Sequence, residues 1–238
     1  MSANHPVEFR DSSHLPRLTQ RGCQVARMAA ETLAAGINSK NPALWEELQA
    51  YEEELDSLDR QMNEDVTAAV ARGSGAQARD LLACLKFILE LERIGDLLLN
   101  AANRFQTVAS RLHPADAKDL SRMAEIVATM LGAVEEAFSS RDVSKALRVL
   151  KADAELDRLR NMFFVRHIEN PDRAPRQESF HLVFICQALE RAGDHAKNLA
   201  EEICHLVSGR SVRHILREQD RPDEHVYIEK MRKTGGKL

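Results

Sequence analysis

An internal repeat constrains the fold of this chain more than any other feature of its sequence. The segment LERIGDLLLN at residues 91–100 returns as LERAGDHAKN at residues 189–198, with six identities in ten positions at an offset of 98. A second match, between EELDSL at 53–58 and AELDRL at 154–159, has an offset of 101. Because self-similarity at a nearly fixed offset is typical of duplicated units, we expect two halves of the same structure.

Each half contains three stretches with helical periodicity. Apolar residues recur at spacings of three and four, and aromatic residues make up only 5% of the chain, which disfavours an all-β fold. Clusters of proline, glycine and polar residues separate the stretches. The expected helices cover residues 15–38, 43–70, 79–111, 115–139, 143–169 and 178–208. The sequence therefore predicts an all-α protein of two tandem three-helix bundles related by internal duplication, with six long helices.

The expected domain organisation follows from these helices. Residues 12–112 form the first three-helix bundle, residues 115–210 form the second, and residues 211–238 form a polar C-terminal tail. No apolar stretch approaches the ~20 residues that cross a bilayer, and the N-terminus lacks the apolar core of a signal peptide. We therefore expect a cytoplasmic protein without a transmembrane segment, which reaches the inner face of a membrane only through partners.

Charge and cysteine content narrow the possible functions. The net charge is −4, so the chain has no overall electrostatic reason to bind nucleic acid, and no direct contact with nucleic acid is expected. The four cysteines are scattered and contain no C-x-x-C pair. They are predicted to be small core residues in a reducing compartment.

Carboxylate pairs spaced four residues apart occur on the second and third predicted helices of each half. Such residues share one helix face, where like charges repel by roughly 0.2–0.5 kcal/mol. Two of these helices side by side would gather four carboxylates, which then need protons or a cation. Oxygen ligands suit hard cations such as Mg²⁺, Mn²⁺, Ca²⁺ or iron. The candidate metal ligands are Glu52, Asp56, Glu92, Asp96, Asp153, Asp157, Glu190 and Asp194.

Asparagine and glycine residues near these pairs add to the prediction. Asn100 and Asn198 lie one turn further along the acidic face, where they either add neutral oxygen ligands or belong to the surface. Gly95 and Gly193 lie inside predicted helices at a cost of roughly 1 kcal/mol each, which indicates close approach of a neighbouring helix. For any one acidic pair, a plain solvated helix face is the alternative to metal binding.

These residues resemble the PhoU family. The resemblance rests on the two LER-x-GD-x-x-x-N segments, the acidic helices before them and VRH at 212–214, and it covers about residues 12–215. It implies two tandem three-helix bundles with E/D-x-x-x-D metal motifs on adjacent helices, commonly in a homodimer. It also implies an accessory protein of the phosphate-specific ABC transporter and of the phosphate-regulon sensor histidine kinase, which dampens uptake and regulon expression when phosphate is plentiful.

The resemblance assigns the metal sites residue by residue. The eight acids above match the family's motif positions, and the ions implied are divalent or trivalent, namely Mg, Mn, Fe or Zn. Family members often continue the motif to a further glutamate, which Glu201 supplies in the second half. Asn103 stands in its place in the first half. The first site is therefore expected to be weaker or to hold fewer metals.

The chain shows no set of residues typical of an enzyme. No Ser/His/Asp set, glycine-rich phosphate loop or G-x-G-x-x-G segment is visible, so a non-enzymatic regulator is predicted. The adjacent Asp194 and His195 leave an HD-type phosphohydrolase as one alternative. A di-iron oxidase is a second alternative, although it would need Glu-x-x-His pairs on its core helices. A helical scaffold without metal is the third alternative.

Overall fold

The computed structural model describes residues 14–71, 78–169 and 177–208, and this part of the chain contains helices and no strands. The predicted tail at 211–238 and the VRH segment at 212–214 lie outside the described residues. The fifth predicted helix changes character at Val165, where one turn of π-helix replaces the α-helix. None of the described helices combines the length and the hydropathy needed to cross a membrane. The helices are α1 (Leu15–Ser39), α2 (Ala43–Ala71), α3 (Ala78–Val108), α4 (Pro114–Ser140), α5 (Val143–Phe164), η3 (Val165–Glu169) and α6 (Gln177–Ser208).

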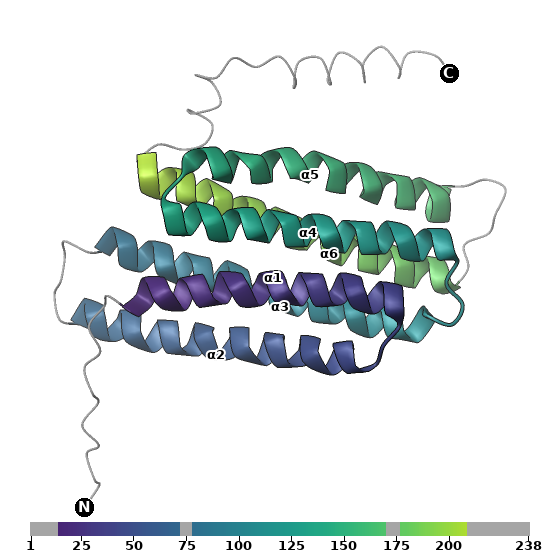
Figure 1. Ribbon diagram of the computed structural model, residues 1–238, viewed down its shortest axis with the longest axis horizontal. Helices are drawn as coiled ribbons and strands as arrows, with labels where there is room; N and C mark the ends of the chain where they lie inside the picture. Colours follow the sequence, from purple (N-terminus) through teal and green to yellow (C-terminus); the bar gives the residue numbers. More distant parts are fainter. Residues whose placement is uncertain (1–13, 72–77, 170–176, 209–238) are drawn as a thin grey trace, which may run out of the picture.

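The helices form two layers of three that run side by side along the long axis of the molecule (Figure 1). Helices α1, α2 and α3 make one bundle, and α4, α5 and α6 make the other. The layers meet where α1 packs along α4 and α3 packs along α6. Helices α2 and α5 lie on the outer sides, and each packs mainly against the helices of its own bundle. The predicted all-α architecture of two tandem three-helix bundles is confirmed.

The turn between the first two helices is built in the same way in both halves. Lys40 and Arg141 end α1 and α4 in the left-handed conformation, with φ of 55° and 53°. The next residues, Asn41 and Asp142, each accept a hydrogen bond from the backbone N–H two positions on, at 3.2 and 2.8 Å. Side chains of this kind satisfy N–H groups that a helix start leaves free. Both pairs are related by the repeat offset of 101, so the duplication extends to the caps.

A glycine–leucine contact brings the two acidic helices together in each half. A Cβ atom on Gly95 would lie 2.7 Å from Leu55 Cδ1, and one on Gly193 would lie 2.3 Å from Leu156 Cδ2. Both leucines are fully buried. The expected close approach of a neighbouring helix at both glycines is confirmed. Without side chains there, α3 and α6 can pack directly against the outer helices α2 and α5.

Replacement of Gly193 by valine should destabilise the protein by about 1–3 kcal/mol, because the added atoms overpack the core against Leu156. Urea unfolding followed by circular dichroism measures this change. Gly132→Val on α4 is the matched control, since its Cβ atom would meet only Arg27 Cδ at 3.4 Å. Equal unfolding midpoints for the two variants would contradict the close-approach argument.

All four cysteines are small buried residues of the core, as predicted. Cys23, Cys84, Cys186 and Cys204 are each buried. Burial raises the pKa of Cys186 to about 12, so this thiol stays protonated at neutral pH. Buried, protonated thiols behave as small apolar side chains and are poor nucleophiles and metal ligands.

Candidate functional site

The first acidic cluster forms where α2 and α3 pack together. Glu52 on α2 and Asp96 on α3 come close enough for the charge of Asp96 to raise the pKa of Glu52, so carboxyl groups from different helices act on each other. Burial first, and then the charges of Asp56 and Asp96, raise the pKa of Glu52. Burial and the charges of Asp96, Asp59 and Asp56 likewise raise the pKa of Glu92. Ionisation of these clustered carboxyl groups therefore costs free energy, and bound protons or a bound cation would reduce that cost.

The second acidic cluster, between α5 and α6, contains its own cations. The Lys197 ammonium lies 2.6 Å from Asp153 Oδ2 and donates a hydrogen bond to it. The guanidinium of Arg160 lies 3.4 Å from Glu190 Oε1 and 3.6 Å from Asp157 Oδ1. Two basic side chains thus enter the same set of carboxylates that the sequence assigned to a metal.

Asp194 completes this second cluster electrostatically. Burial raises the pKa of Glu190, the charge of Arg160 lowers it, and the charge of Asp194 raises it. The pKa of Glu190 lies above its ordinary value as a result. Burial lowers the pKa of Lys197, but the hydrogen bond to Asp153 and the nearby charge of Asp194 leave it above its ordinary value. Lys197 therefore stays charged within the cluster.

The three additional candidate ligands point elsewhere or lie on the surface. Asn100 Oδ1 accepts a hydrogen bond from Arg104 Nε at 2.8 Å, one turn along α3. Asn198 Nδ2 donates to Glu90 Oε2 at 3.3 Å, across the contact between α6 and α3. Glu201 is exposed on α6. A role for these three residues in metal binding stays a prediction.

The carboxylates do not form a ready-made coordination sphere. Among residues 14–71, 78–169 and 177–208, no three His, Cys, Asp or Glu side chains converge in a way that would hold a metal ion. The first cluster nevertheless fits a hard cation in its chemistry, because its donors are carboxylate oxygens of like charge, and the pKa values of Glu52 and Glu92 are raised. Binding there would require side-chain rotation. The second cluster fits a metal poorly, because an ammonium already faces Asp153.

The two cations of the second cluster are functional candidates that the sequence analysis did not identify. Comparison of the repeats could have found them. At an offset of 98, Lys197 corresponds to Leu99, and at an offset of 101, Arg160 corresponds to Asp59. The motif search compared the acids that the halves share and did not compare the charges by which they differ.

His195 lies away from the acidic cluster of its own repeat. Its Nδ1 atom is 2.6 Å from Glu90 Oε2 on α3, so the imidazole faces the contact between the two bundles. Asp194 instead contributes its charge to the cluster around Glu190. The two residues of the HD dipeptide therefore face different parts of the structure, and the geometry lends no support to joint ligation of one metal.

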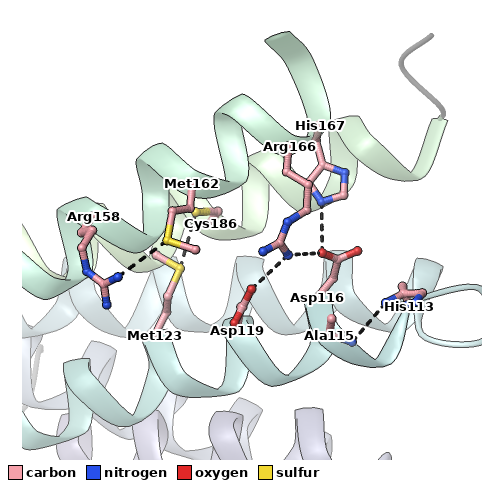
Figure 2. A network of polar contacts seen from close by, with 10 residues as sticks. All are labelled: His113, Ala115, Asp116, Asp119, Met123, Arg158, Met162, Arg166, His167 and Cys186. Carbon is pink, nitrogen blue, oxygen red and sulfur yellow. Dashed lines mark hydrogen bonds and ion pairs between the residues drawn. The ribbon is translucent and has the colours of Figure 1, made fainter. Parts of the chain in front are cut away.

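A second polar network joins the end of the outer helix to the start of α4 (Figure 2). Asp116 is 7% exposed, and its Oδ1 atom lies 2.7 Å from Arg166 Nη1 and 3.2 Å from His167 Nε2. Arg166 also contacts Asp119 Oδ2 at 3.0 Å, and the His167 ring stacks on Phe163. The sequence analysis missed this network because its members lie about 50 residues apart and carry no repeated motif.

Substitution of Glu52 by glutamine should stabilise the metal-free protein at pH 7 by roughly 0.2–0.5 kcal/mol, since it removes like-charge repulsion on the α2 face. A pKa that is raised in the folded state gives stability below the unfolded pKa and loses it as pH rises. The advantage of Glu52→Gln should therefore disappear on acidification to about pH 4.

Urea unfolding of wild type and Glu52→Gln in excess chelator, at pH 7 and at pH 4, measures this difference. Glu64→Gln, an exposed position on the same helix, serves as the control and should change stability little at either pH. A lower stability of Glu52→Gln at pH 7 would show that the first cluster is not strained by its charge.

The comparison with protein families places the chain among known proteins. The model of the PhoU domain matches residues 19–105 and again residues 120–203, one match in each half. The chain belongs to the PhoU family. The internal duplication therefore corresponds to two PhoU domains, and each domain carries one of the two acidic clusters.

Relatives at the sequence level span most of the chain. A phosphate-specific transport system accessory protein PhoU homolog from Rhizobium meliloti is 30% identical over 198 residues, which cover 81% of this chain and 83% of the relative. A PhoU homolog with the same description from Zymomonas mobilis is 32% identical over 196 residues, or 79% and 81% of the two chains.

Solved PhoU structures share the fold. The crystal structure of PhoU from Pseudomonas aeruginosa matches with a TM-score of 0.74 at 20% identity, over 83% of this chain and 97% of that one. The phosphate transport system regulatory protein PhoU from Streptococcus pneumoniae gives the same TM-score at 19% identity, over 84% and 96%. At these identities the likeness establishes the common fold.

Proposed function

We propose that this chain is an accessory protein of a phosphate-specific transport system, which lowers phosphate uptake and phosphate-regulon expression when phosphate is plentiful. The observation that carries the proposal is the PhoU domain match in both halves. Relatives described as accessory proteins of phosphate-specific transport support it over about four fifths of the chain.

The protein acts by binding and catalyses no reaction of its own. Its partners are the cytoplasmic ATPase side of the phosphate ABC transporter and the sensor histidine kinase of the phosphate regulon. It works in the cytoplasm as a homodimer. The separation of Asp194 from His195 supports a non-enzymatic role, because it leaves the HD dipeptide without a shared site.

The first acidic cluster binds a divalent or trivalent metal ion (Mg, Mn, Fe or Zn) through the α2 and α3 carboxylates. When bound, the metal supplies positive charge that neutralises these groups. Because the charge of Asp96 on α3 acts on Glu52 on α2, a metal ion bound by both carboxylates would link the two helices. The metal is a structural or interaction element in this proposal. The proposed ligands are Glu52, Asp56, Glu92 and Asp96.

Exposed aromatic side chains on α6 offer a contact surface for a protein partner. Phe180 and Phe184 lie one turn apart, with exposed fractions of 53% and 49%. The guanidinium of Arg104 on α3 lies 4.8 Å from the centre of the Phe184 ring. Neighbouring exposed apolar groups bordered by charge are typical of protein interaction sites.

The proposal is tested by pull-down with the tagged full-length chain from cells grown in high and in low phosphate. We expect the transporter ATPase and the sensor kinase to be retained, and Phe180→Ala with Phe184→Ala to weaken retention. The control is Val70→Ala with Val207→Ala, which trims exposed aliphatic residues elsewhere. Failure of the wild-type chain to retain either partner in either medium would contradict the proposal and favour a helical scaffold with another role.

A further inference from the structure

The two acidic clusters differ in what neutralises them. In the second cluster, Lys197 Nζ lies 2.6 Å from Asp153 Oδ2, and Asp153 is only 8% exposed. Arg160 reaches Glu190, whose side chain is 15% exposed, at 3.4 Å. The Nε atom of Arg160 is buried and finds no hydrogen-bond partner among the described residues. Both cations thus reach the most buried acids of the cluster, and Arg160 leaves one donor unsatisfied in doing so.

The first cluster has neither of these cations. At the repeat offsets, Leu99 occupies the position of Lys197, and Asp59 occupies the position of Arg160. Where the second half gains an ammonium and a guanidinium, the first half therefore has an apolar side chain and one more carboxylate.

The basic side chains near the first cluster lie at its edge. Arg60 contacts Asp56 at 2.9 Å, but its side chain is 66% exposed and the pair spans one turn of a single helix. Arg93, next to Glu92 on α3, is exposed to solvent. Exposed pairs of this kind neutralise little, because water screens them. The acids that face each other across α2 and α3 keep their mutual repulsion.

An ammonium and a metal ion compete for the same oxygen atoms. A metal bound to Asp153 Oδ2 would stand beside the charge of Lys197, and partial burial strengthens the repulsion between two positive charges. Loss of Lys197 from this position would in turn leave Asp153 buried without a partner. Among the described residues, the buried acids Asp153 and Glu190 of the second cluster therefore already have cationic partners, whereas Glu52 and Glu92 of the first have none within ion-pair distance.

We propose that Lys197 and Arg160 are built-in cations of the second acidic cluster, so that metal binds in the first PhoU domain and not in the second. This inference rests on the metal binding proposed above for the first domain. It reverses the expectation that Asn103, in place of the glutamate found at Glu201, makes the first site the weaker one.

Metal content of paired variants tests the inference. The full-length chain is stripped with chelator, equilibrated with Mn²⁺, dialysed and analysed for manganese per protein. Glu92→Gln with Asp96→Asn removes the α3 acids of the first cluster and should abolish the bound Mn²⁺. Glu190→Gln with Asp194→Asn removes the corresponding acids of the second cluster and should leave the Mn²⁺ content at the wild-type value. Loss of Mn²⁺ from this second variant would overturn the inference.

A variant that should gain metal binding gives an independent test. Lys197→Leu with Arg160→Asp gives the second cluster the residues found in the first, and it should about double the bound Mn²⁺. The control, Arg191→Leu with Arg148→Asp, changes the net charge equally on the same two helices at exposed positions. An unchanged Mn²⁺ content in Lys197→Leu with Arg160→Asp, or an equal gain in the control, would contradict the role of built-in cations.

Failure of the inference can be told apart from failure of the proposed metal site. If the wild-type chain binds no Mn²⁺ and Lys197→Leu with Arg160→Asp does bind it, the metal site in the first domain is wrong and the built-in cations stand. If the latter variant fails to fold, the comparison of the two acid variants still decides. Thermal unfolding with and without Mn²⁺ supplies the folding check for each variant.

Discussion

Replacement of Asp116 by alanine should lower the free energy of unfolding by about 1.5–3 kcal/mol, the range for hydrogen bonds to charged groups. The substitution removes the 7% exposed carboxylate that lies 2.7 Å from Arg166 and 3.2 Å from His167. The network fastens η3, and with it the end of α5, to the first turn of α4 (Figure 2). Urea unfolding at pH 7 measures the loss.

The same variant has a predicted pH dependence. Burial raises the pKa of Asp116, but the hydrogen bonds from His167 and Arg166 together lower it by more. The pKa therefore lies below its usual range. A lowered folded-state pKa gives stability that is complete above the ordinary Asp pKa of about 4 and is lost as pH falls through the folded-state value. The difference between wild type and Asp116→Ala should therefore be constant from pH 5 upward and shrink in strong acid.

A matched aspartate in the other half controls for the helix dipole. Asp80 also lies in the first turn of its helix, but its side chain is 59% exposed and its contact with Arg141 is 3.8 Å long. Asp80→Ala should change stability by no more than about 0.5 kcal/mol. Equal effects at the two positions would mean that the buried network adds nothing beyond an ordinary helix start.

The fold followed from the sequence because local and repeated signals agreed. The period of the apolar residues indicated six helices, proline and glycine clusters separated them, and the duplicated LER-x-GD-x-x-x-N segment indicated two equivalent halves. The π-turn at η3 carried no such signal. It follows Phe163 and contains His167, whose position depends on Asp116, a residue about 50 positions earlier in the chain.

The sequence shows which carboxylates lie on the acidic helices but not which cations accompany them. Spacing of four residues put the acids of α2 and α3 on one face of each helix, and the charge of Asp96 acts on Glu52 across the two helices; their role as metal ligands stays a prediction. It did not show that Lys197 would lean toward Asp153 on the neighbouring helix. That contact depends on the distance between two packed helices, which one-dimensional spacing leaves open. The cations that neutralise each acidic cluster can therefore be identified only from the three-dimensional structure.

The account makes its largest cellular prediction for a strain that lacks this gene. The proposed role places the protein between the transporter and the sensor kinase, so phosphate-acquisition genes should be derepressed in phosphate-rich medium when the protein is absent. Restoring the wild-type gene should restore repression. In phosphate-poor medium, where the regulon is already induced, deletion and wild type should differ little.

A phosphate-regulon reporter measured in phosphate-rich medium decides whether the protein represses the regulon. Three strains are compared: wild type, the deletion strain, and the deletion strain that carries the restored gene. The account predicts low reporter activity in the first and third strains and high activity in the deletion strain. Low activity in all three would contradict it, because the PhoU fold would then be present without the regulatory role proposed for this chain.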